Sequence, residues 1–490
     1  MKKFRIAAVD IARRHPLYLK GTTDAAYARF ASDLAELLEK FDVEEFKGDN
    51  ARELAIVLTM YYEDMISDLG IWNSLTDAFH ELYGRLLPFY DVDMQTYYRN
   101  EPNACDMRFL IWLLMTRTSP GSVPSPDAPV LDMVANGVCQ FMDKRFEDMP
   151  VNEELKEFFT KAKFADNYYI QRDVMKWAYF SCYASCNENA PLLINQQAQA
   201  LHNQFHCPPP TAMNLAESVA VYEGRLQPLA MRPQDWLARI VRANGNTEAA
   251  QKIASQRYLP FDFYLIKDAK LGESMTFESV KGEKFTVSDL NLLHPQPECY
   301  GAKSILCFFA EYDGAFYIGT ESSWSNVTDA FEAEKKTRKE NATLCIANRR
   351  RLIEENNDSP LFYFNNADTL RLFLTERVGL PAKTVSQLSL PKDDTDFTVF
   401  VRESDFNVSF FPNVARLIRD ERNPLFDAEY AKEHTFSNIF MLPGDMLRYL
   451  NDHDMLSEAR FNSFGSEEDS KRLVKENFDF LARLMLGKAY

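Results

Sequence analysis

The sequence predicts an α+β protein that is predominantly α-helical, and three observations lead to this prediction. Long segments on both sides of the chain's centre carry apolar residues at spacings of three and four, which is typical of amphipathic helices. Residues 261–324 instead alternate between apolar and polar with a period of two, and a second alternating pair of segments lies within 396–411. We therefore expect a helical N-terminal domain (1–255), a small five-stranded antiparallel β-barrel (256–325), and a helical C-terminal domain (326–490) with a β-hairpin.

The helices are predicted from capping residues and apolar stripes. Asp49 and Asn50 offer a cap for a helix that Gly70 closes. The segment 106–116 is apolar on nearly every face, so we expect it in the middle of a helical bundle. The expected helices are 25–41, 51–70, 72–86, 106–116, 130–146, 153–164, 167–186, 191–206, 214–222, 233–242, 327–355, 368–377, 427–440, 443–452 and 467–486.

The central segment predicts short antiparallel strands joined by tight turns. Asp313-Gly314 favours a type I′ turn, and 280–283 forms a second hairpin turn. Ser304–Ala310 is almost continuously apolar, so we expect a central strand there. Short antiparallel strands of this kind usually curl into a small barrel. The expected strands are 262–267, 274–279, 284–287, 303–311 and 315–319.

Composition and charge limit the classes of function. Of the 490 residues, 46% are hydrophobic, 13% are aromatic and 26% are charged, which indicates a globular chain with a sizeable core. The net charge of −17 argues against nucleic acid as the main partner. The most basic run, 348–351, is followed by Glu354 and Glu355, so it is interpreted as a solvated helix face.

The eight scattered cysteines and the N-terminus predict a soluble cytoplasmic protein. The cysteines do not form the framework of a disulfide-rich domain, and most lie in apolar runs. The N-terminal apolar run is interrupted by Asp10, which is unlike a signal peptide. No stretch approaches ~18 uninterrupted apolar residues, so no membrane span is expected.

The first candidate for chemistry is the carboxylate cluster Glu63, Asp64 and Asp68. Asp64 and Asp68 are four residues apart and share a face of the predicted helix. Two buried carboxylates on one face could bind a metal ion or act as an acid/base pair, whereas the alternative is a solvated acidic face. The hypothesis of a metal site also requires a Glu-x-x-His motif on another helix, and His80 has no Glu three residues before it.

The second candidate is the spacing of Cys182 and Cys186 with His202 and His206, which is similar to a two-Cys, two-His zinc site. Both pairs lie on predicted helices joined by a short turn. In an antiparallel hairpin the histidines would lie ~16–24 Å from that turn, at a rise of 1.5 Å per residue, while the cysteines lie next to it. We therefore expect no metal or other cofactor, and core cysteines beside histidines at a helix end.

Other patterns of catalysis and binding are weak. His206 and Cys207 are adjacent and would point in different directions, so they do not predict a nucleophile pair. No GxSxG, Gly-rich phosphate loop or HExxH is present. Phe316, Tyr317 and Trp324 are candidate binding aromatics of the barrel, but their neighbours are mainly acidic, which favours a structural or protein-binding barrel over a nucleic-acid-binding one.

Several segments together resemble one family. These segments are HPLYLKGTTDAAYARFASDL, YYEDMISDLGIWNSL, EYDGAFYIGTESSW, MLPGDMLRYLNDHDML and KENFDFLARL. They are similar to an uncharacterised bacterial domain-of-unknown-function family that is common in gut anaerobes. The resemblance covers most of the chain and implies the layout above and a bacterial cytoplasm. It implies no catalytic residue, substrate or cofactor.

Three functional hypotheses remain open. The leading one is a non-enzymatic intracellular binding or regulatory protein with an unidentified protein partner, because catalytic motifs are lacking and aromatics could line a groove. The second is a metal-dependent or acid/base hydrolase that uses the 63–68 cluster, with Tyr61, Tyr62 or His80 nearby. A pocket where these carboxylates converge with Arg or His would favour it. The third is a nucleic-acid-associated protein that acts through the barrel.

Overall fold

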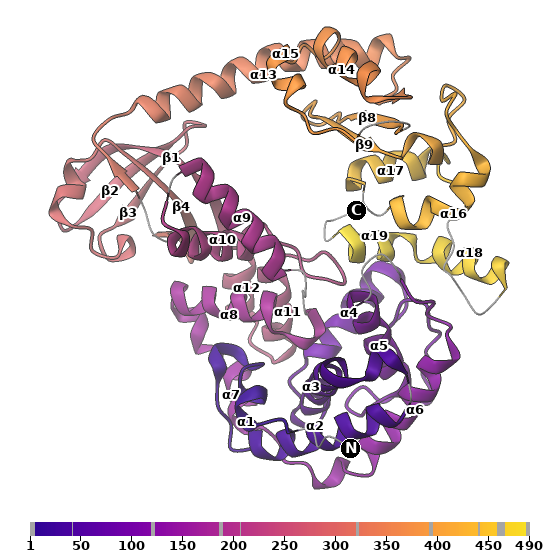
Figure 1. Ribbon diagram of the computed structural model, residues 1–490. Coiled ribbons are helices and arrows are strands. Elements are labelled where there is room, and N and C mark those ends of the chain that lie inside the picture. Colours follow the sequence, from indigo (N-terminus) through magenta and orange to yellow (C-terminus); the bar gives the residue numbers. More distant parts are fainter. Residues whose placement is uncertain are drawn as a thin grey trace. The chain divides into compact units, whose positions relative to one another are not determined.

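The structure is a computed structural model that describes residues 5–41, 43–118, 123–185, 190–205, 207–319, 323–391, 395–439, 442–457 and 466–486. The chain divides into two compact units (Figure 1). Unit 1 comprises Met1–Thr328, and unit 2 comprises Asp329–Phe461 with Ser466–Tyr490. The predicted helical domain 1–255 and the predicted strand segment 256–325 both lie in unit 1. Whether the strand segment forms a domain of its own stays a prediction.

Unit 1 begins with helices at nearly all the positions that the sequence predicts. Two further helices were not predicted: the five-residue α1, and the eight-residue α12, where the Asn246 side chain accepts a hydrogen bond from the backbone N–H of Ala249. The helices are α1 (Ala8–Ala12), α2 (Asp24–Leu38), α3 (Gly48–Ser67), α4 (Ile71–Tyr83), α5 (Ala104–Thr118), α6 (Pro129–Asp143), α7 (Glu153–Lys161), α8 (Tyr168–Phe180), α9 (Ala190–Phe205), α10 (Pro209–Glu223), α11 (Pro233–Ala243) and α12 (Thr247–Ala254).

Helices α3 and α5 form the centre of this helical bundle. Six consecutive residues of α5, Phe109 to Leu114, are buried, which confirms the prediction from its all-round apolar surface. The C-terminal half of α3 is buried in the same way, from Leu54 to Met65, although it carries Glu63 and Asp64. Two carboxylates of α3 are therefore in the core, where only hydrogen bonds or opposite charges can compensate for lost hydration.

The central strands form one antiparallel sheet in the order β3-β2-β1-β4-β5, with β6 also paired to β4. The predicted turn at Asp313-Gly314 is confirmed, because both residues have the positive φ (49° and 75°) that a type I′ turn requires. Strand β4 pairs with three strands, so Ser304–Ala310 is a central strand as predicted. The strands are β1 (Arg257–Lys270), β2 (Ser274–Ser279), β3 (Lys284–Ser288), β4 (Ser304–Tyr312), β5 (Ala315–Ile318) and β6 (Ser323–Ser325).

The predicted closed barrel is wrong, because the hydrogen-bonded path of the described strands starts at β3 and ends at β5. A barrel requires its first and last strands to pair. Here the two short edge strands meet through side chains instead: the rings of Phe285 on β3 and Phe316 on β5 stack with centroids 4.8 Å apart. The sheet is thus curled around an aromatic core that includes Phe277 and Phe309, and it stays open.

The other face of this sheet packs on helices of unit 1, as the neighbouring ribbons in Figure 1 illustrate. Tyr258 stacks on Tyr222 of α10 with ring centroids 4.9 Å apart. Tyr317 stacks on Tyr168 of α8 at 4.6 Å. The Tyr312 hydroxyl donates to the Ala165 carbonyl at 2.6 Å. The sheet is therefore buried on both faces along β4, which explains its continuous apolar sequence.

Unit 2 is built on a three-stranded sheet in the order β7-β8-β9. The predicted hairpin 396–411 is confirmed as β8 and β9, while β7 was not predicted. Phe397, Val399 and Val401 of β8 pack with residues of α14 and α15, and Phe400 packs with residues of α17. Figure 1 shows α14 and α17 on opposite sides of the sheet. The elements are α13 (Asp329–Glu355), β7 (Leu361–Phe364), α14 (Ala367–Glu376), α15 (Ala382–Ser386), β8 (Phe397–Val401), β9 (Val408–Pro412), α16 (Ala428–Ile439), α17 (Gly444–Asp452), α18 (Glu467–Glu476) and α19 (Phe478–Leu486).

The last predicted helix, 467–486, is two helices separated at Asn477, whose side chain donates to the Leu473 carbonyl at 2.8 Å. Within the described ranges, no helix combines the length and the apolar character that crossing a membrane requires.

Candidate functional site

The three predicted carboxylates of α3 occupy different environments. The exposed fractions of Glu63 and Asp64 are 1% and 0%, so the alternative of a solvated acidic face is wrong for both. Helix α3 ends at Ser67, and Asp68 adopts a left-handed conformation with φ of 53°. The Asp68 side chain is therefore solvated, 58% exposed, and lies 3.6 Å from Lys156. The expected shared face of Asp64 and Asp68 does not form, because the helix ends between them.

Asp64 holds the start of the next helix. Its two oxygens accept hydrogen bonds from the backbone N–H groups of Ile71 (3.2 Å) and Trp72 (2.7 Å), the first residues of α4. The Tyr183 hydroxyl donates to it at 2.5 Å. Burial raises the pKa of Asp64 to about 6, although these hydrogen bonds act in the opposite direction. The carboxylate thus serves as a buried cap for α4.

Glu63 binds the N-terminal segment through His15. The His15 Nε2 lies 2.8 Å from a Glu63 oxygen, and its Nδ1 donates to the Leu19 carbonyl at 3.0 Å. The Asn152 side-chain amide donates to the other Glu63 oxygen at 2.7 Å. Burial alone would lower the pKa of His15, but the hydrogen bond and charge of Glu63, together with the Leu19 carbonyl and Asp24, raise it. His15 and Glu63 therefore form a buried ion pair.

A third buried carboxylate, Asp106 at the start of α5, was not among the predicted site residues. It accepts hydrogen bonds from the hydroxyls of Tyr61 (2.8 Å) and Tyr97 (3.3 Å), and burial raises its pKa to about 7. An acidic residue at the head of an apolar helix was the available sequence signal. The other predicted neighbours lie elsewhere: the Tyr62 hydroxyl donates to the Met142 carbonyl, and His80 is exposed on α4.

These contacts leave the carboxylate cluster with little chemistry of its own. Every oxygen of Glu63 and Asp64 and both ring nitrogens of His15 already have protein partners. A general base needs a free lone pair within hydrogen-bond reach of the substrate. In the part of the chain that the structure describes, no group of three His, Cys, Asp or Glu side chains is placed to hold a metal ion.

The predicted cysteine and histidine set is only partly described. Cys182 is buried, and burial raises its pKa to about 11. His202 lies on α9, where its Nδ1 is 2.7 Å from the Cys207 carbonyl. Cys186 and His206 lie outside the described residues. The expected absence of a zinc site, and of a His206–Cys207 nucleophile pair, stays a prediction.

The predicted binding aromatics of the strand segment are packed within unit 1. Phe316 stacks on Phe285 and Tyr317 stacks on Tyr168, as described above. Trp324 is partly buried against the core of the sheet. Whether their remaining exposed edges bind a partner, protein or nucleic acid, stays a prediction.

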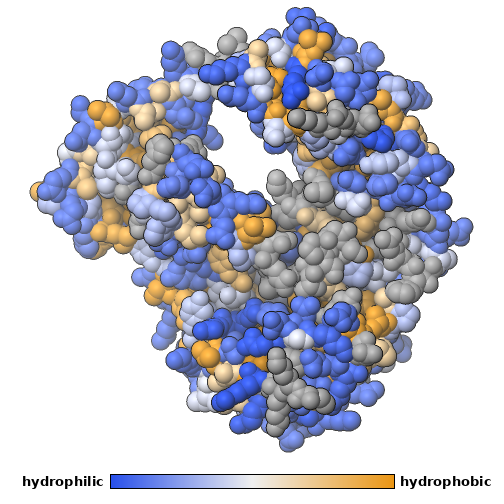
Figure 2. All heavy atoms as spheres, viewed as in Figure 1, coloured by the Kyte–Doolittle hydropathy of each residue, from blue (hydrophilic) through white to orange (hydrophobic). Residues whose placement is uncertain are grey.

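A cavity in unit 1 is a stronger candidate than any surface patch. On the face shown in Figure 2, hydrophilic residues cover most of the coloured surface and hydrophobic residues form separate patches. The cavity has a volume of about 630 Å³ and lies beside His15, with walls from α8, α9 and α10. Its aromatic lining residues are Tyr18, Trp177 and Phe180. This volume is in the range of small-molecule sites.

The cavity wall contains strained backbone. Leu17 and Tyr18 both have positive φ (55° and 53°), a conformation that costs a non-glycine residue roughly 1 kcal/mol or more. Their side chains remain 43% and 67% exposed, although both are large and apolar or aromatic. The His15–Glu63 pair anchors the residue directly before Pro16 and so helps to hold this turn in place.

Charges of both signs line the cavity, and all but one have a partner of opposite charge. Arg13 lies 3.9 Å from Asp10, and Lys176 lies 3.9 Å from Asp173. Glu217 of α10 also lines the cavity and is half-buried. No hydrogen bond or ion pair joins Glu217 to another described residue. Among the charged residues that line the cavity, Glu217 therefore stands out as a carboxylate without a described partner, and it shares the wall with three aromatic rings.

Comparison with known proteins identifies the family. The family described as "Protein of unknown function (DUF3843)" matches residues 8–285 and 307–487. The chain belongs to the DUF3843 family. No curated protein matches the chain. No solved structure matches it either.

The DUF3843 match confirms the resemblance that the sequence segments indicated. Its first range includes His15, Glu63 and Glu217, and therefore the cavity of unit 1. The bacterial origin and the cytoplasmic location that the resemblance implied stay predictions. The description of DUF3843 assigns no activity.

Proposed function

We propose that this DUF3843 protein is a non-enzymatic binding protein whose unit 1 cavity takes a small organic cation with an apolar body. The observation that supports this proposal is Glu217, a half-buried carboxylate with no partner among the described residues, in a wall shared with Tyr18, Trp177 and Phe180. Aromatic faces attract cations, most strongly quaternary ammonium groups, and a carboxylate adds direct charge complementarity.

The occupied atoms of the His15–Glu63 pair support binding over catalysis. His15 reaches the cavity wall, but its Nε2 is engaged by Glu63 and its Nδ1 by the Leu19 carbonyl. It can position the turn at Leu17 and Tyr18, while proton transfer to a ligand would require breaking one of these bonds. The strained turn at Leu17 and Tyr18 is already fixed in the cavity wall. Such preorganisation reduces the entropy that is lost when a ligand binds.

Isothermal titration of the full-length chain with phenyltrimethylammonium tests the proposal. We expect saturable binding that Glu217→Gln weakens about tenfold, while Glu298→Gln, which removes an exposed carboxylate outside the cavity, leaves it unchanged. Benzoate, which has a similar ring and the opposite charge, should bind more weakly. Equal binding by the two variants, or tighter binding of benzoate, would contradict the proposal.

One observation favours a second function, an acid/base hydrolase. His15 lines the cavity and is hydrogen-bonded to Glu63, so one predicted carboxylate does converge with a histidine beside a pocket. The test is hydrolysis of p-nitrophenyl acetate and p-nitrophenyl phosphate by the wild-type chain and by His15→Gln. A wild-type rate that a folded His15→Gln variant lacks would favour the enzyme over the binding protein.

A further inference from the structure

A second cavity, in unit 2, has the opposite charge character. It has a volume of about 390 Å³ and lies among α17, α18, the start of α19 and the segment that contains Arg419. Four cationic side chains line it, Arg419, Lys471, Arg472 and Lys475, against a single carboxylate, Asp454. In a chain with a net charge of −17, such a concentration of positive charge in one concave site is unexpected by composition.

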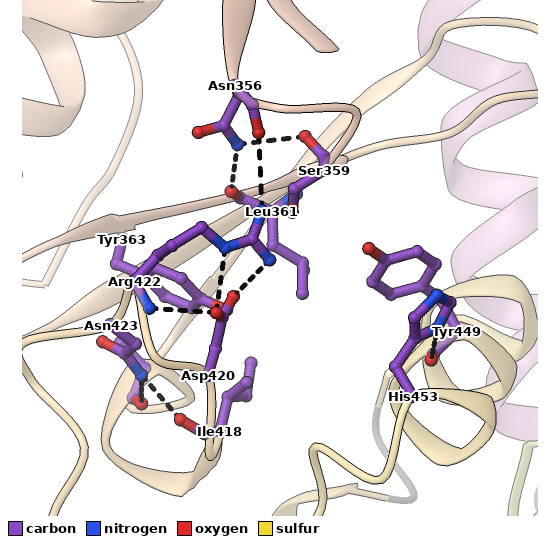
Figure 3. Close-up of polar contacts among 11 residues, drawn as sticks. Asn356, Ser359, Leu361, Tyr363, Ile418, Asp420, Arg422, Asn423, Tyr449 and His453 are labelled. Atoms are coloured by element: carbon purple, nitrogen blue, oxygen red, sulfur yellow. Dashed lines mark hydrogen bonds and ion pairs between the residues drawn. The ribbon is translucent and has the colours of Figure 1, made fainter. Parts of the chain in front are cut away.

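Asp420, the residue after Arg419, belongs to a polar network with Arg422 and Tyr363 (Figure 3). Asp420 is bound by the Arg422 guanidinium at 2.9 Å and 2.7 Å, and by the Tyr363 hydroxyl at 2.8 Å. The backbone N–H of Arg419 donates to the Met455 carbonyl at 2.8 Å. The Asp420 N–H also donates to the Ile418 carbonyl at 3.1 Å, which closes a tight turn at Arg419. The Arg419 guanidinium donates to the carbonyl and the carboxylate of Asp454, both at 3.1 Å, and these bonds hold its side chain at the cavity.

Helix α18 contributes the other cations. Lys471 and Lys475 are four residues apart, so they share a face of the helix. Cations in the last turn of a helix also stabilise its dipole, which accounts for Lys475 in structural terms. The dipole does not account for Arg419, which comes from a different segment. Two separate elements therefore direct positive charge to one site.

Three of the four cations of this cavity are only weakly compensated by the protein, and the fourth, Lys471, pairs with Glu467 at 3.1 Å. Arg419 contacts the Asp454 carboxylate at 3.1 Å, but the Asp454 side chain is 95% exposed, so water screens the pair. Arg472 pairs with Asp469 at 3.0 Å, again with both side chains more than half exposed. Lys475 has no hydrogen bond or ion pair with another described residue. A doubly charged anion would replace weak partners by stronger ones.

We propose that this cavity binds an organic phosphate monoester with a small apolar substituent. A phosphate monoester carries roughly −1.5 to −2 charges at neutral pH, and its oxygens match the forked donors of arginine. Leu456, Val474 and Phe478 supply an apolar wall for the substituent. The site is separate from the cavity of unit 1 and takes a ligand of opposite charge, so each proposal can fail without the other.

Titration of the full-length chain with phenyl phosphate at low and high salt tests this inference. We expect saturable binding that is tighter than that of inorganic phosphate and that weakens as salt rises. Arg419→Gln and Lys475→Gln should each weaken binding about fivefold or more. The matched control is Lys383→Gln, which removes an exposed cation of unit 2 that lies outside the cavity.

Thermal unfolding of the same variants shows whether a loss of affinity comes from the altered site or from loss of the folded structure. Lys475 is exposed, so Lys475→Gln should stay folded with at most a small drop in unfolding temperature from the lost dipole interaction, and its loss of affinity would then report on the site. Unchanged affinity in both cavity variants would overturn the inference. Absence of phenyl phosphate binding at low salt would also overturn it. Equal affinity for inorganic phosphate and phenyl phosphate would overturn it too, because the apolar wall would then contribute nothing to binding.

Discussion

The core carboxylates Glu63 and Asp64 and the cavity carboxylate Glu217, all in unit 1, differ in whether their oxygens have hydrogen-bond partners. Glu63 and Asp64 lie on α3 in the core, and every oxygen of both accepts a hydrogen bond from a named donor. Glu217 lies on α10 in a cavity wall, half-buried, with no partner among the described residues. Burial alone therefore does not identify a functional acid in this chain. The hydrogen-bond partners of a carboxylate are more informative, because a carboxylate whose oxygens all accept hydrogen bonds stabilises the fold, while one without partners can bind a ligand.

Asp64→Ala gives the largest effect that this comparison predicts. The substitution leaves the N–H groups of Ile71 and Trp72 and the Tyr183 hydroxyl without their acceptor in the core. Unpaired buried donors and the loss of the α4 cap should together reduce the free energy of unfolding by about 3–5 kcal/mol. Chemical denaturation of the wild type and the variant at pH 7 measures this difference.

Asp64→Asn is the matched control for that experiment. It keeps one acceptor oxygen for α4, so its loss of stability should be less than half that of Asp64→Ala. If both variants were as stable as the wild type while a ligand-binding or catalytic property changed, Asp64 would belong with Glu217 and not with the structural set.

The pH dependence of stability gives a smaller effect, through Asp106. Burial raises its pKa in the folded chain to about 7, above the value of about 3.9 expected in the unfolded chain. The folded chain then keeps a proton that the unfolded chain releases between about pH 4 and pH 7. Stability should fall as pH rises through this window, by at most ~1.4 kcal/mol per pH unit from this group.

Asp106→Asn removes that contribution, since the amide does not titrate. The difference in unfolding free energy between the variant and the wild type should therefore change in favour of the variant from pH 5 to pH 7.5. Parallel pH profiles for the two proteins would show that Asp106 does not titrate in this window. A variant that is unfolded at both pH values would instead show that the hydrogen bonds from Tyr61 and Tyr97 need a carboxylate.

Most helices, strands and turns of this fold could be predicted from the sequence, whereas the open shape of the sheet and the polar contacts between elements could not. The apolar run of α5 is enough to place it in the core, and Asp313-Gly314 is enough to place a turn, because both are local. The barrel prediction failed because closure depends on whether β3 and β5 pair, and the rings of Phe285 and Phe316 meet there instead. Strand periodicity carries no information on such a long-range contact.

The candidate sites were predicted even less well, and for a similar reason. Glu63 was found as a carboxylate, but its partners His15 and Asn152 are 48 and 89 residues away in the chain. Neither Glu217 nor Arg419 belongs to a recognisable motif. Each is a candidate because of the charged groups that lie near it, or do not, in the folded chain. Those neighbours come from distant parts of the sequence and are known only from the packing of the elements.

Asp68→Asn should give the smallest effect, and it tests whether an exposed carboxylate near Asp64 contributes to stability. Asp68 directly follows the last residue of α3 and is only four residues from Asp64, but its side chain is 58% exposed and its partner, Lys156, lies 3.6 Å away. Screened pairs of this kind contribute about 0–1 kcal/mol. Asn tolerates the left-handed conformation at this position, with φ of 53°, and removing a negative charge from the C-terminus of α3 offsets part of the loss. The free energy of unfolding should stay within ~0.5 kcal/mol of the wild type in the denaturation experiment used for Asp64. A loss above ~1.5 kcal/mol would mean that exposure does not separate the carboxylates of α3, and the structural set would then have to include all three.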